Sequence, residues 1–304
     1  MTVAEFIAVD ACWICGGTSF EPIDDAAFDL TEYQRQDPDL AAYSGRHVSI
    51  QRCTACDFAQ PAALPALPRF FDRMYDQRWS DDWVAREHDA GYKDLIFADI
   101  LSGLARRTRP GVLLDVGAHA GRFLRLASGA GWEAEGLELN PKTAAFAARA
   151  TGAIVHQGNV HTFRPTRRYD AITLIDVLEH VPQPIDVMSR VRDYLAPGGW
   201  LAVKVPNGPA QRAKERLRAR LRPGYRATIA DNLVHVNHFS AASLTRALNV
   251  AGFRDVRVVA AAPELPHQSG TGWLRLGAFR LSRAVPRGTS LPLAFNLQAY
   301  AQRD

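Results

Sequence analysis

Residues 112–123 read Val-Leu-Leu-Asp-Val-Gly-Ala-His-Ala-Gly-Arg-Phe, and this stretch decides the fold. Apolar residues lead into Asp115, then Gly117 and Gly121 bracket a tight turn, and an apolar helical pattern begins at Phe123. The pattern predicts a buried strand that runs through a glycine loop into the N-terminus of a helix. Glycines let a backbone approach a ligand closely, and free N–H groups at a helix N-terminus favour polar or anionic atoms. The loop therefore indicates a site for a nucleotide-like cofactor, without indicating which one.

Acidic residues around this loop narrow the choice of cofactor. A dinucleotide fingerprint requires Gly-x-Gly-x-x-Gly, but His119 stands where the second glycine would be. The Asp115 carboxylate would also repel a pyrophosphate at the end of the first strand. The ligand should instead carry positive charge and a ribose, which fits S-adenosylmethionine (SAM). Glu138 closes the next apolar strand and is placed to accept hydrogen bonds from both ribose hydroxyls.

These residues resemble the class I SAM-dependent methyltransferases, and the resemblance continues downstream. Further motifs follow in the order of that family over roughly residues 110–260, at 158–160, 170–181, 195–199 and 238–253. An unrelated α/β sheet with a coincidental glycine loop would not carry these motifs in this order. The resemblance implies a Rossmann-like, seven-stranded, mostly parallel sheet with helices on both faces and an antiparallel last strand.

The resemblance also implies which residues contact SAM. They are Asp115, Gly117, Ala118, His119, Gly121, Glu138, Leu139, Asn159, Val160, Asp176 and Val177. Two of them depart from the usual pattern of the family. His119 replaces the middle glycine, so we expect a different loop shape near the methionine end of SAM. Asn159 replaces the commoner aspartate, and its amide oxygen can still accept a hydrogen bond from the adenine amino group.

All four cysteines lie in two Cys-x-x-Cys pairs, Cys12 with Cys15 and Cys53 with Cys56. Two such turns can present four thiolates to a tetrahedral Zn²⁺, and no open coordination position is apparent, so we predict a structural zinc. Because 37 residues separate the pairs, the ribbon must carry a loop, which we expect within 26–44. Disulfides or a redox pair are the alternatives. The N-terminus does not resemble a signal peptide, and reduced cysteines in a cytoplasmic protein favour zinc.

Prolines and apolar periodicity divide the chain into three regions. Residues 1–62 are predicted to form the zinc-ribbon module, and 63–110 a helical segment, which this family often packs over the cofactor mouth. Residues 111–304 form the α/β domain, because strand and helix patterns alternate there. Strands are predicted near 112–116, 133–138, 153–157, 170–175, 199–205, 253–260 and 293–302, and helices near 121–130, 141–151, 183–195 and 240–251.

Charge is distributed unevenly along the chain. Residues 1–203 hold 20 Lys and Arg against 27 Asp and Glu, whereas 204–304 hold 16 against 5. Much of the excess lies in an insertion at about 207–239, where Leu217 and Leu221 at i, i+4 spacing indicate a basic amphipathic helix. This helix is either a solvated surface helix or a lid that attracts an anionic substrate, such as a nucleotide-linked or lipid-linked sugar or RNA. No apolar stretch is long enough to predict a membrane span.

Methyl transfer from a sulfonium depends mainly on holding the acceptor in line with the S–CH₃ bond. A hydroxyl acceptor must also lose a proton, which a histidine at the pocket mouth can take. His180 follows the fourth strand, at the edge where ligands bind in open α/β sheets. His235 and His238 lie in the loop that should return to the same edge. All three are candidate catalytic bases, and each has a structural hydrogen-bonding role as the alternative.

Three functions fit these features. The first is methylation of a small molecule, above all O-methylation of a sugar or glycoconjugate, because the zinc module ahead of this domain resembles bacterial methyltransferases of sugar and polysaccharide biosynthesis. The related sugar C-methyltransferases carry a further large C-terminal domain. The sequence indicates no such domain after the α/β domain, so we expect O-transfer rather than C-transfer. The second is RNA methylation, supported by the basic C-terminal third but opposed by the acidic loop of the zinc module. The third, a non-catalytic SAM-binding protein, is disfavoured by the intact set of SAM motifs. Oligomeric state and acceptor atom stay open.

Overall fold

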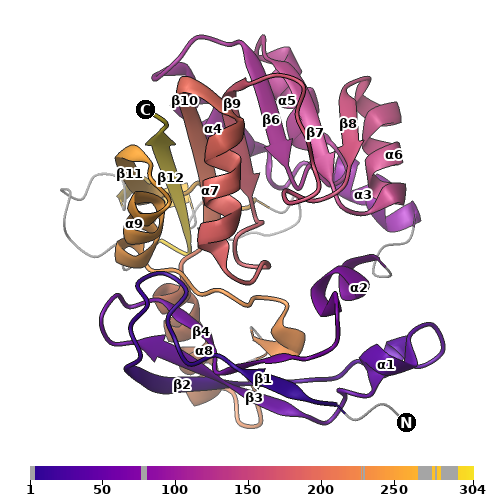
Figure 1. Cartoon of the computed structure of the whole chain (residues 1–304), viewed down its shortest axis with the longest axis vertical. Coiled ribbons are helices and arrows are strands. Elements are labelled where there is room, and N and C mark those ends of the chain that lie inside the picture. The colour runs from indigo at the N-terminus through magenta and orange to yellow at the C-terminus, as the bar shows by residue number, and fades with distance from the viewer. Residues whose placement is uncertain are drawn as a thin grey trace.

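A seven-stranded sheet forms the centre of the upper part of the molecule in Figure 1. The structure is a computed structural model that describes residues 4–76, 81–226, 228, 230–265, 276–277, 279–281 and 294–304. The strands lie in the order β11-β12-β10-β9-β6-β7-β8. They span Val112–Val116 (β6), Glu133–Glu138 (β7), Ile154–Gln157 (β8), Tyr169–Ile175 (β9), Leu195–Pro206 (β10), Arg254–Ala260 (β11) and Asn296–Gln302 (β12). Because β12 runs antiparallel to both of its neighbours and the other pairs are parallel, the predicted mostly parallel sheet is confirmed.

Helices cover both faces of this sheet. They are α3 (Asp81–Ala90), α4 (Asp94–Ala105), α5 (Arg122–Gly129), α6 (Pro141–Thr151), α7 (Pro184–Tyr194) and α9 (Ala241–Val250). Successive strand residues point to opposite faces, so Leu113 enters the core beneath α4 and α5, whereas Leu114 enters the core beneath α7 and α9. The side chain of Asn140 caps the N-terminus of α6 and that of Ser240 caps α9, at the helix starts that the sequence predicts.

Most element boundaries lie within a residue or two of the prediction, and the two differences that matter concern β10 and β12. Strand β10 begins at Leu195 rather than near 199, so the family motif at 195–199 lies inside the strand, where the pairing register shifts before Trp200. The predicted start of the last strand, at 293, lies outside the described residues, and β12 begins at Asn296. The helical pattern predicted ahead of the sheet is present as α2 (Phe70–Asp76), α3 and α4.

The N-terminal part of the chain forms a small β module below the sheet (Figure 1). Strands β2 (Phe20–Ala27), β3 (His47–Cys53) and β4 (Ala59–Pro61) form one antiparallel sheet, and β1 (Phe6–Ala8) pairs with β5 (Ala63–Pro65). The loop predicted within 26–44 contains the short helices η1 (Thr31–Tyr33) and α1 (Pro38–Ala41). Because β5 pairs with β1, the module extends past the boundary predicted at residue 62.

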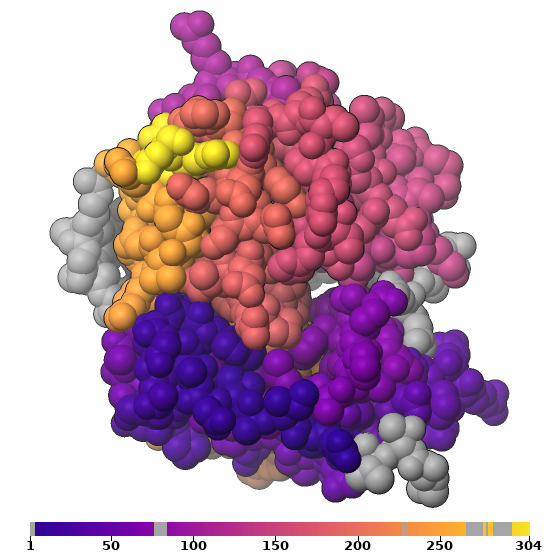
Figure 2. Space-filling model, viewed as in Figure 1, coloured from indigo at the N-terminus to yellow at the C-terminus, as the bar shows by residue number. Residues whose placement is uncertain are grey.

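The module packs against the α/β domain along a broad surface (Figure 2). Aromatic rings fill its core: the Tyr43 ring lies 6.3 Å from that of Phe28 and 5.4 Å from that of Phe70, which belongs to α2. Ala59 of β4 and His238 of the α/β domain exchange backbone hydrogen bonds of 3.2 and 2.9 Å. The module therefore holds α2 and the chain around His238 in place next to the sheet.

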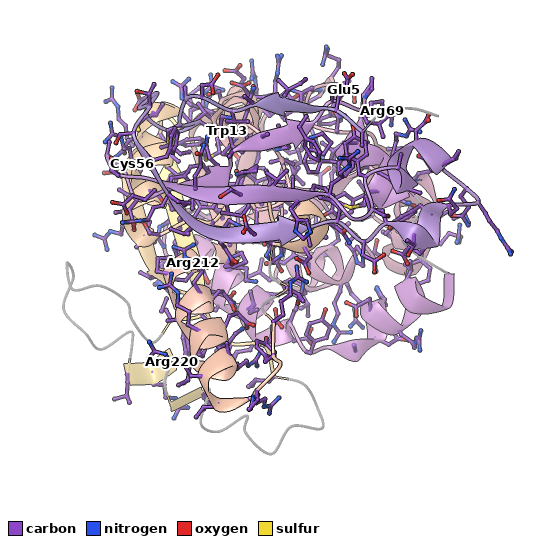
Figure 3. All side chains as sticks on the ribbon, turned by 90° about the horizontal axis from the view of Figure 1, so that it is seen from below. Glu5, Trp13, Cys56, Arg69, Arg212 and Arg220 are labelled. Atoms are coloured by element: carbon purple, nitrogen blue, oxygen red, sulfur yellow. The ribbon has the colours of Figure 1, made fainter. Side chains whose placement is uncertain are left out.

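The predicted basic helix is present as α8 (Gly208–Leu221), which leaves the sheet directly after β10. It runs out from the side of the module, and Arg212 lies closer to Cys56 than Arg220 does (Figure 3). A short helix, η2 (Asp231–Leu233), follows it and contacts β2 through a hydrogen bond from the Ala27 N–H to the Asp231 carboxylate. Within the described ranges, no helix is both long enough and apolar enough to span a bilayer.

Candidate functional site

A cavity of about 590 Å³ opens at the carboxyl edge of β6, β7 and β9. The chain passes from β8 at one edge back to β9 on the other side of β6, so this edge is the topological switch point where open α/β sheets bind ligands. The walls come from residues 115–120, 137–140, 158–161 and 175–177, with Tyr75, Tyr92, Lys93 and His180 beside them. Of the predicted cofactor residues, all but Gly121 line this cavity.

The glycine loop follows β6 in a conformation that needs its glycines. Gly117 has φ +77°, and a Cβ there would lie 2.6 Å from the Val177 side chain. Gly121 also has φ +77° and forms the N-cap of α5, where a Cβ would lie 2.9 Å from the Thr151 side chain. His119 adopts φ +48° without that freedom. The loop therefore leaves its backbone close to the cavity, as the sequence predicts.

Two buried carboxylates face this loop. The Asp115 carboxylate, 3% exposed, accepts a hydrogen bond of 2.6 Å from the Thr173 hydroxyl. Burial raises the pKa of Asp115 to about 7, although the Thr173 hydrogen bond opposes the shift. Glu138 accepts backbone hydrogen bonds from His119 (2.8 Å) and Asn140 (3.0 Å), and burial raises its pKa. A cationic ligand would favour the ionised form of both groups.

The Asn159 side chain does not have the geometry expected from the sequence. Its amide oxygen accepts hydrogen bonds from the backbone N–H groups of His161 (2.9 Å) and Thr162 (3.0 Å). An amide oxygen has two lone pairs, so these two hydrogen bonds occupy both acceptor positions of the Asn159 side chain. The predicted contact to an adenine amino group is therefore not available in this conformation. Asn159 and Val160 still line the cavity.

A partly buried ion-pair network also borders the cavity. Asp176, just after β9, pairs with Lys93 at 2.8 Å and also with Lys204 of β10. Although burial disfavours its charged form, the two ammonium groups hold the pKa of Asp176 well below its usual range. Sequence reasoning missed both lysines. Lys204 was detectable as the single charge in an apolar strand, whereas only the tertiary structure brings Lys93 here.

His180 lines the cavity beside this network, whereas His235, which lies next to it, and His238 do not line the cavity. The His180 Nδ1 is 2.6 Å from the Val234 carbonyl oxygen and 2.7 Å from the Tyr75 hydroxyl. The His235 ring centroid is 5.0 Å from that of His180, and burial lowers the pKa of His235 to about 3. His238 is 5% exposed and is held by its backbone bridge to Ala59. This position corrects the prediction that His238 lies at the pocket mouth.

Glu179, His180 and His235 also bring potential metal-ligand atoms within 4.8 Å of one another. Glu179 is 1% exposed, and its Oε2 has no hydrogen-bond partner among the described residues. Burial, reinforced by Asp176, raises the pKa of Glu179 well above its usual value. The neighbouring carboxylate of Asp176 is already paired with the ammonium groups of Lys93 and Lys204, which lie beside this corner.

The four cysteines converge at one end of the module. Their sulfur atoms lie within 4.8 Å of one another, with 3.6 Å between Cys12 and Cys56 and 3.5 Å between Cys15 and Cys53. None of them forms a disulfide. Four thiolates at the usual Zn–S distance of about 2.3 Å have edges of about 3.8 Å in a tetrahedron. The arrangement therefore fits a tetrahedral zinc ion.

Comparisons with known proteins agree with this geometry. Residues 88–258, more than half of the chain, match the sequence profile of a family described as "Methyltransferase domain". A trans-aconitate 2-methyltransferase of Streptomyces avermitilis is 32% identical over 188 residues, which cover 58% of this chain and 64% of that protein. A ubiquinone biosynthesis O-methyltransferase of Paraburkholderia phytofirmans is 26% identical over 144 residues, or 44% and 60% of the two chains. The chain thus spans less than two thirds of these relatives.

Solved structures support the fold. A SAM-dependent methyltransferase from Thermotoga maritima superposes with a TM-score of 0.53 at 16% sequence identity. The superposition covers 77% of this chain and 100% of that one. At 16% identity this likeness concerns the fold alone, that is, the arrangement of the sheet and its helices.

Proposed function

The chain belongs to the Methyltransferase domain family as a SAM-dependent methyltransferase, and from that premise we propose that it O-methylates a small molecule, with a sugar or glycoconjugate hydroxyl as the acceptor. Both curated relatives named above are methyltransferases whose names specify small molecules, which supports this size of acceptor. The resemblance of the N-terminal module to those of sugar-pathway methyltransferases supports the sugar class.

The residues around the glycine loop fit SAM. When bound, SAM supplies an electrophilic methyl group on a positively charged sulfur. Asp115 and Glu138 place two buried carboxylates where a cation and a ribose would favour them, and Gly117 keeps the backbone close. We assign cofactor binding to the same residues that the sequence predicts. Asn159 would contribute by stabilising the turn at the cavity wall, not by a side-chain hydrogen bond to adenine.

His180 is the proposed base, and one observation carries this assignment. Its Nδ1 lies 2.6 Å from the Val234 carbonyl oxygen, which can only accept, so this contact favours the tautomer with the hydrogen on Nδ1, and the Tyr75 hydroxyl 2.7 Å from Nδ1 is then a second acceptor. A neutral ring then keeps its lone pair on Nε2, where it can take the proton of an acceptor hydroxyl. His235 beside it stays neutral at pH 7 because burial lowers its pKa, so no imidazolium forms there to repel the proton.

The acceptor end of the cavity suits a small polyol. Tyr75, Glu87 and Tyr92 line it together with Lys93 and offer donors and acceptors for hydroxyl groups. Lys93 is paired with Asp176, so it does not present a free cation for a nucleic-acid phosphate. These features favour a sugar over RNA.

We further propose that Cys12, Cys15, Cys53 and Cys56 hold a structural Zn²⁺. The ion would fix the two turns of the module, whose core includes Phe70 of α2. Because α2 also carries Tyr75 to the cavity wall, the ion would support the acceptor site from a distance.

Transfer of a labelled methyl group from SAM tests the proposal. The purified chain is incubated with nucleotide-linked sugars, with a lipid-linked saccharide extract and, separately, with total RNA. We expect label in the sugar fractions, and nuclear magnetic resonance of the product should show a new O–CH₃ group. Label in RNA that ribonuclease releases would overturn the sugar assignment. A chain that does not bind SAM in calorimetry would contradict the cofactor assignment as well.

A further inference from the structure

The outer half of α8 is an exposed helix with an apolar stripe that none of the described residues covers. Residues 216–224 are all exposed, and Leu217 and Leu221 are 56% and 72% exposed. Ala213, Leu217 and Leu221 are spaced by four residues, so they lie one above the other on a single face of the helix. Exposed leucines in water are unfavourable, and adjacent ones on one helix face form a patch.

Cationic side chains flank this stripe on both sides. At 3.6 residues per turn, Arg216 and Arg220 fall on one side of the leucines, and Lys214 and Arg218 fall on the other. Lys214 and Arg218 lie within 4 Å of Glu215, which is buried toward the body of the protein. Arg216 and Arg220 are both exposed and pair with no carboxylate of the described residues, and Figure 3 shows Arg220 on the outer part of α8. The exposed face of α8 is therefore apolar at its centre and positive at its margins.

This arrangement discriminates between partners. A nucleic acid would use the arginines but would leave both leucines in water. A second copy of the chain would cover the leucines but would bring the two rows of arginines together around a two-fold axis. An anionic bilayer uses both features, because leucines enter the acyl boundary while long cationic side chains reach the phosphates.

We propose that α8 docks the protein on the surface of an anionic lipid membrane. The helix would lie in the plane of the interface, with Leu217 and Leu221 inserted and Arg216 and Arg220 on the lipid phosphates. The docking is peripheral, and it does not depend on the acceptor proposed above. It would bring the enzyme to the surface where lipid-linked acceptors reside.

Vesicle co-sedimentation of the full chain tests the proposal. Vesicles of phosphatidylcholine alone are compared with vesicles that contain equal parts of phosphatidylglycerol, without SAM or acceptor. Each arginine near an anionic surface strengthens binding about fivefold, so Arg216→Gln/Arg220→Gln should bind about 25-fold more weakly. Leu217→Ser/Leu221→Ser should lose at least about tenfold through lost insertion. The control Arg125→Gln/Arg149→Gln removes two exposed charges from α5 and α6 and should bind like the wild type.

Three results would overturn the proposal. The first is equal binding to neutral and anionic vesicles. The second is wild-type vesicle binding by either α8 double variant, since the leucines and the arginines must both contribute. The third is a dimer in solution that Leu217→Ser/Leu221→Ser dissociates, which would assign the stripe to a subunit interface. Circular dichroism checks that each variant is folded, and failure of SAM binding would bear on the proposed function alone.

Discussion

The Glu138 carboxylate accepts a hydrogen bond from the backbone N–H of His119, 2.8 Å away, and so ties the end of β7 to the loop after β6. His119 is the residue at which this loop departs from the glycine pattern, and it adopts φ +48°. A non-glycine residue in that conformation needs support from its surroundings. The acid predicted to bind a ribose therefore also holds the loop in the shape that the cofactor meets.

Replacing Glu138 by glutamine should weaken SAM binding. The amide keeps one acceptor oxygen, so one of the two backbone N–H groups loses its partner, and the charge is lost too. Loss of a hydrogen bond to a buried charge predicts a dissociation constant about 10- to 100-fold higher, measured by isothermal titration calorimetry. Glu133→Gln, on the exposed end of the same strand, is the control. Equal affinities for SAM in the two variants would contradict the assigned role.

SAM affinity should also fall as pH decreases through 7. Burial raises the pKa of Asp115 to about 7, and a bound cation would lower it, so binding below pH 7 must release a proton. The affinity should be constant above about pH 8 and fall up to about tenfold per pH unit below 7. Calorimetry in two buffers of different ionisation enthalpy measures the released proton. In Asp115→Asn the affinity should be weaker and should lose this pH dependence.

The sequence predicts the parts of the site that depend on local pattern. The strand, the glycine loop and the acid after β7 follow from residue spacing along short segments, and Asp115, Gly117 and Glu138 lie together as expected. The parts that depend on tertiary packing were not predictable. Lys93 reaches Asp176 only because α4 docks on the sheet, and His238 turns away because β4 pairs with its backbone.

Lys204→Met should destabilise the fold strongly. Lys204 is 2% exposed, and Asp176 lies between it and Lys93 with 19% of its side chain exposed. The variant therefore leaves the Asp176 carboxylate with only one of its two ammonium partners. Breaking a buried ion pair from one side costs about 3–5 kcal/mol of the free energy of unfolding, and because Asp176 is partly exposed and keeps Lys93 we expect a loss near the lower end, about 3 kcal/mol. Denaturant titration measures the change, and Lys142→Met on the exposed start of α6 should stay close to the wild type. The double variant Lys204→Met/Asp176→Asn should recover part of the loss, and no recovery would argue against a charge effect.

Cys53→Ser should remove one zinc ion per chain. The sulfur atoms of the four cysteines are close enough for one tetrahedral ion, and loss of one thiolate weakens the set. Elemental analysis of the purified protein should find about one zinc in the wild type and almost none in the variant. Thr54→Ser, in the same turn, should keep its zinc. Wild-type protein that holds no metal and shows no free thiols would favour disulfides instead.

His180→Ala should abolish most methyl transfer while SAM still binds. The proposed base role predicts a fall in kcat of about 10²- to 10⁴-fold, with a dissociation constant for SAM within about twofold of the wild type. His238→Gln is the contrasting variant, because His238 is buried outside the cavity and should serve the fold alone. Its kcat per folded enzyme should stay near that of the wild type, whereas its thermal stability should change. A large fall in kcat for His238→Gln together with full activity of His180→Ala would reverse the two roles and would make His238 the general base among the three candidates that the sequence indicates.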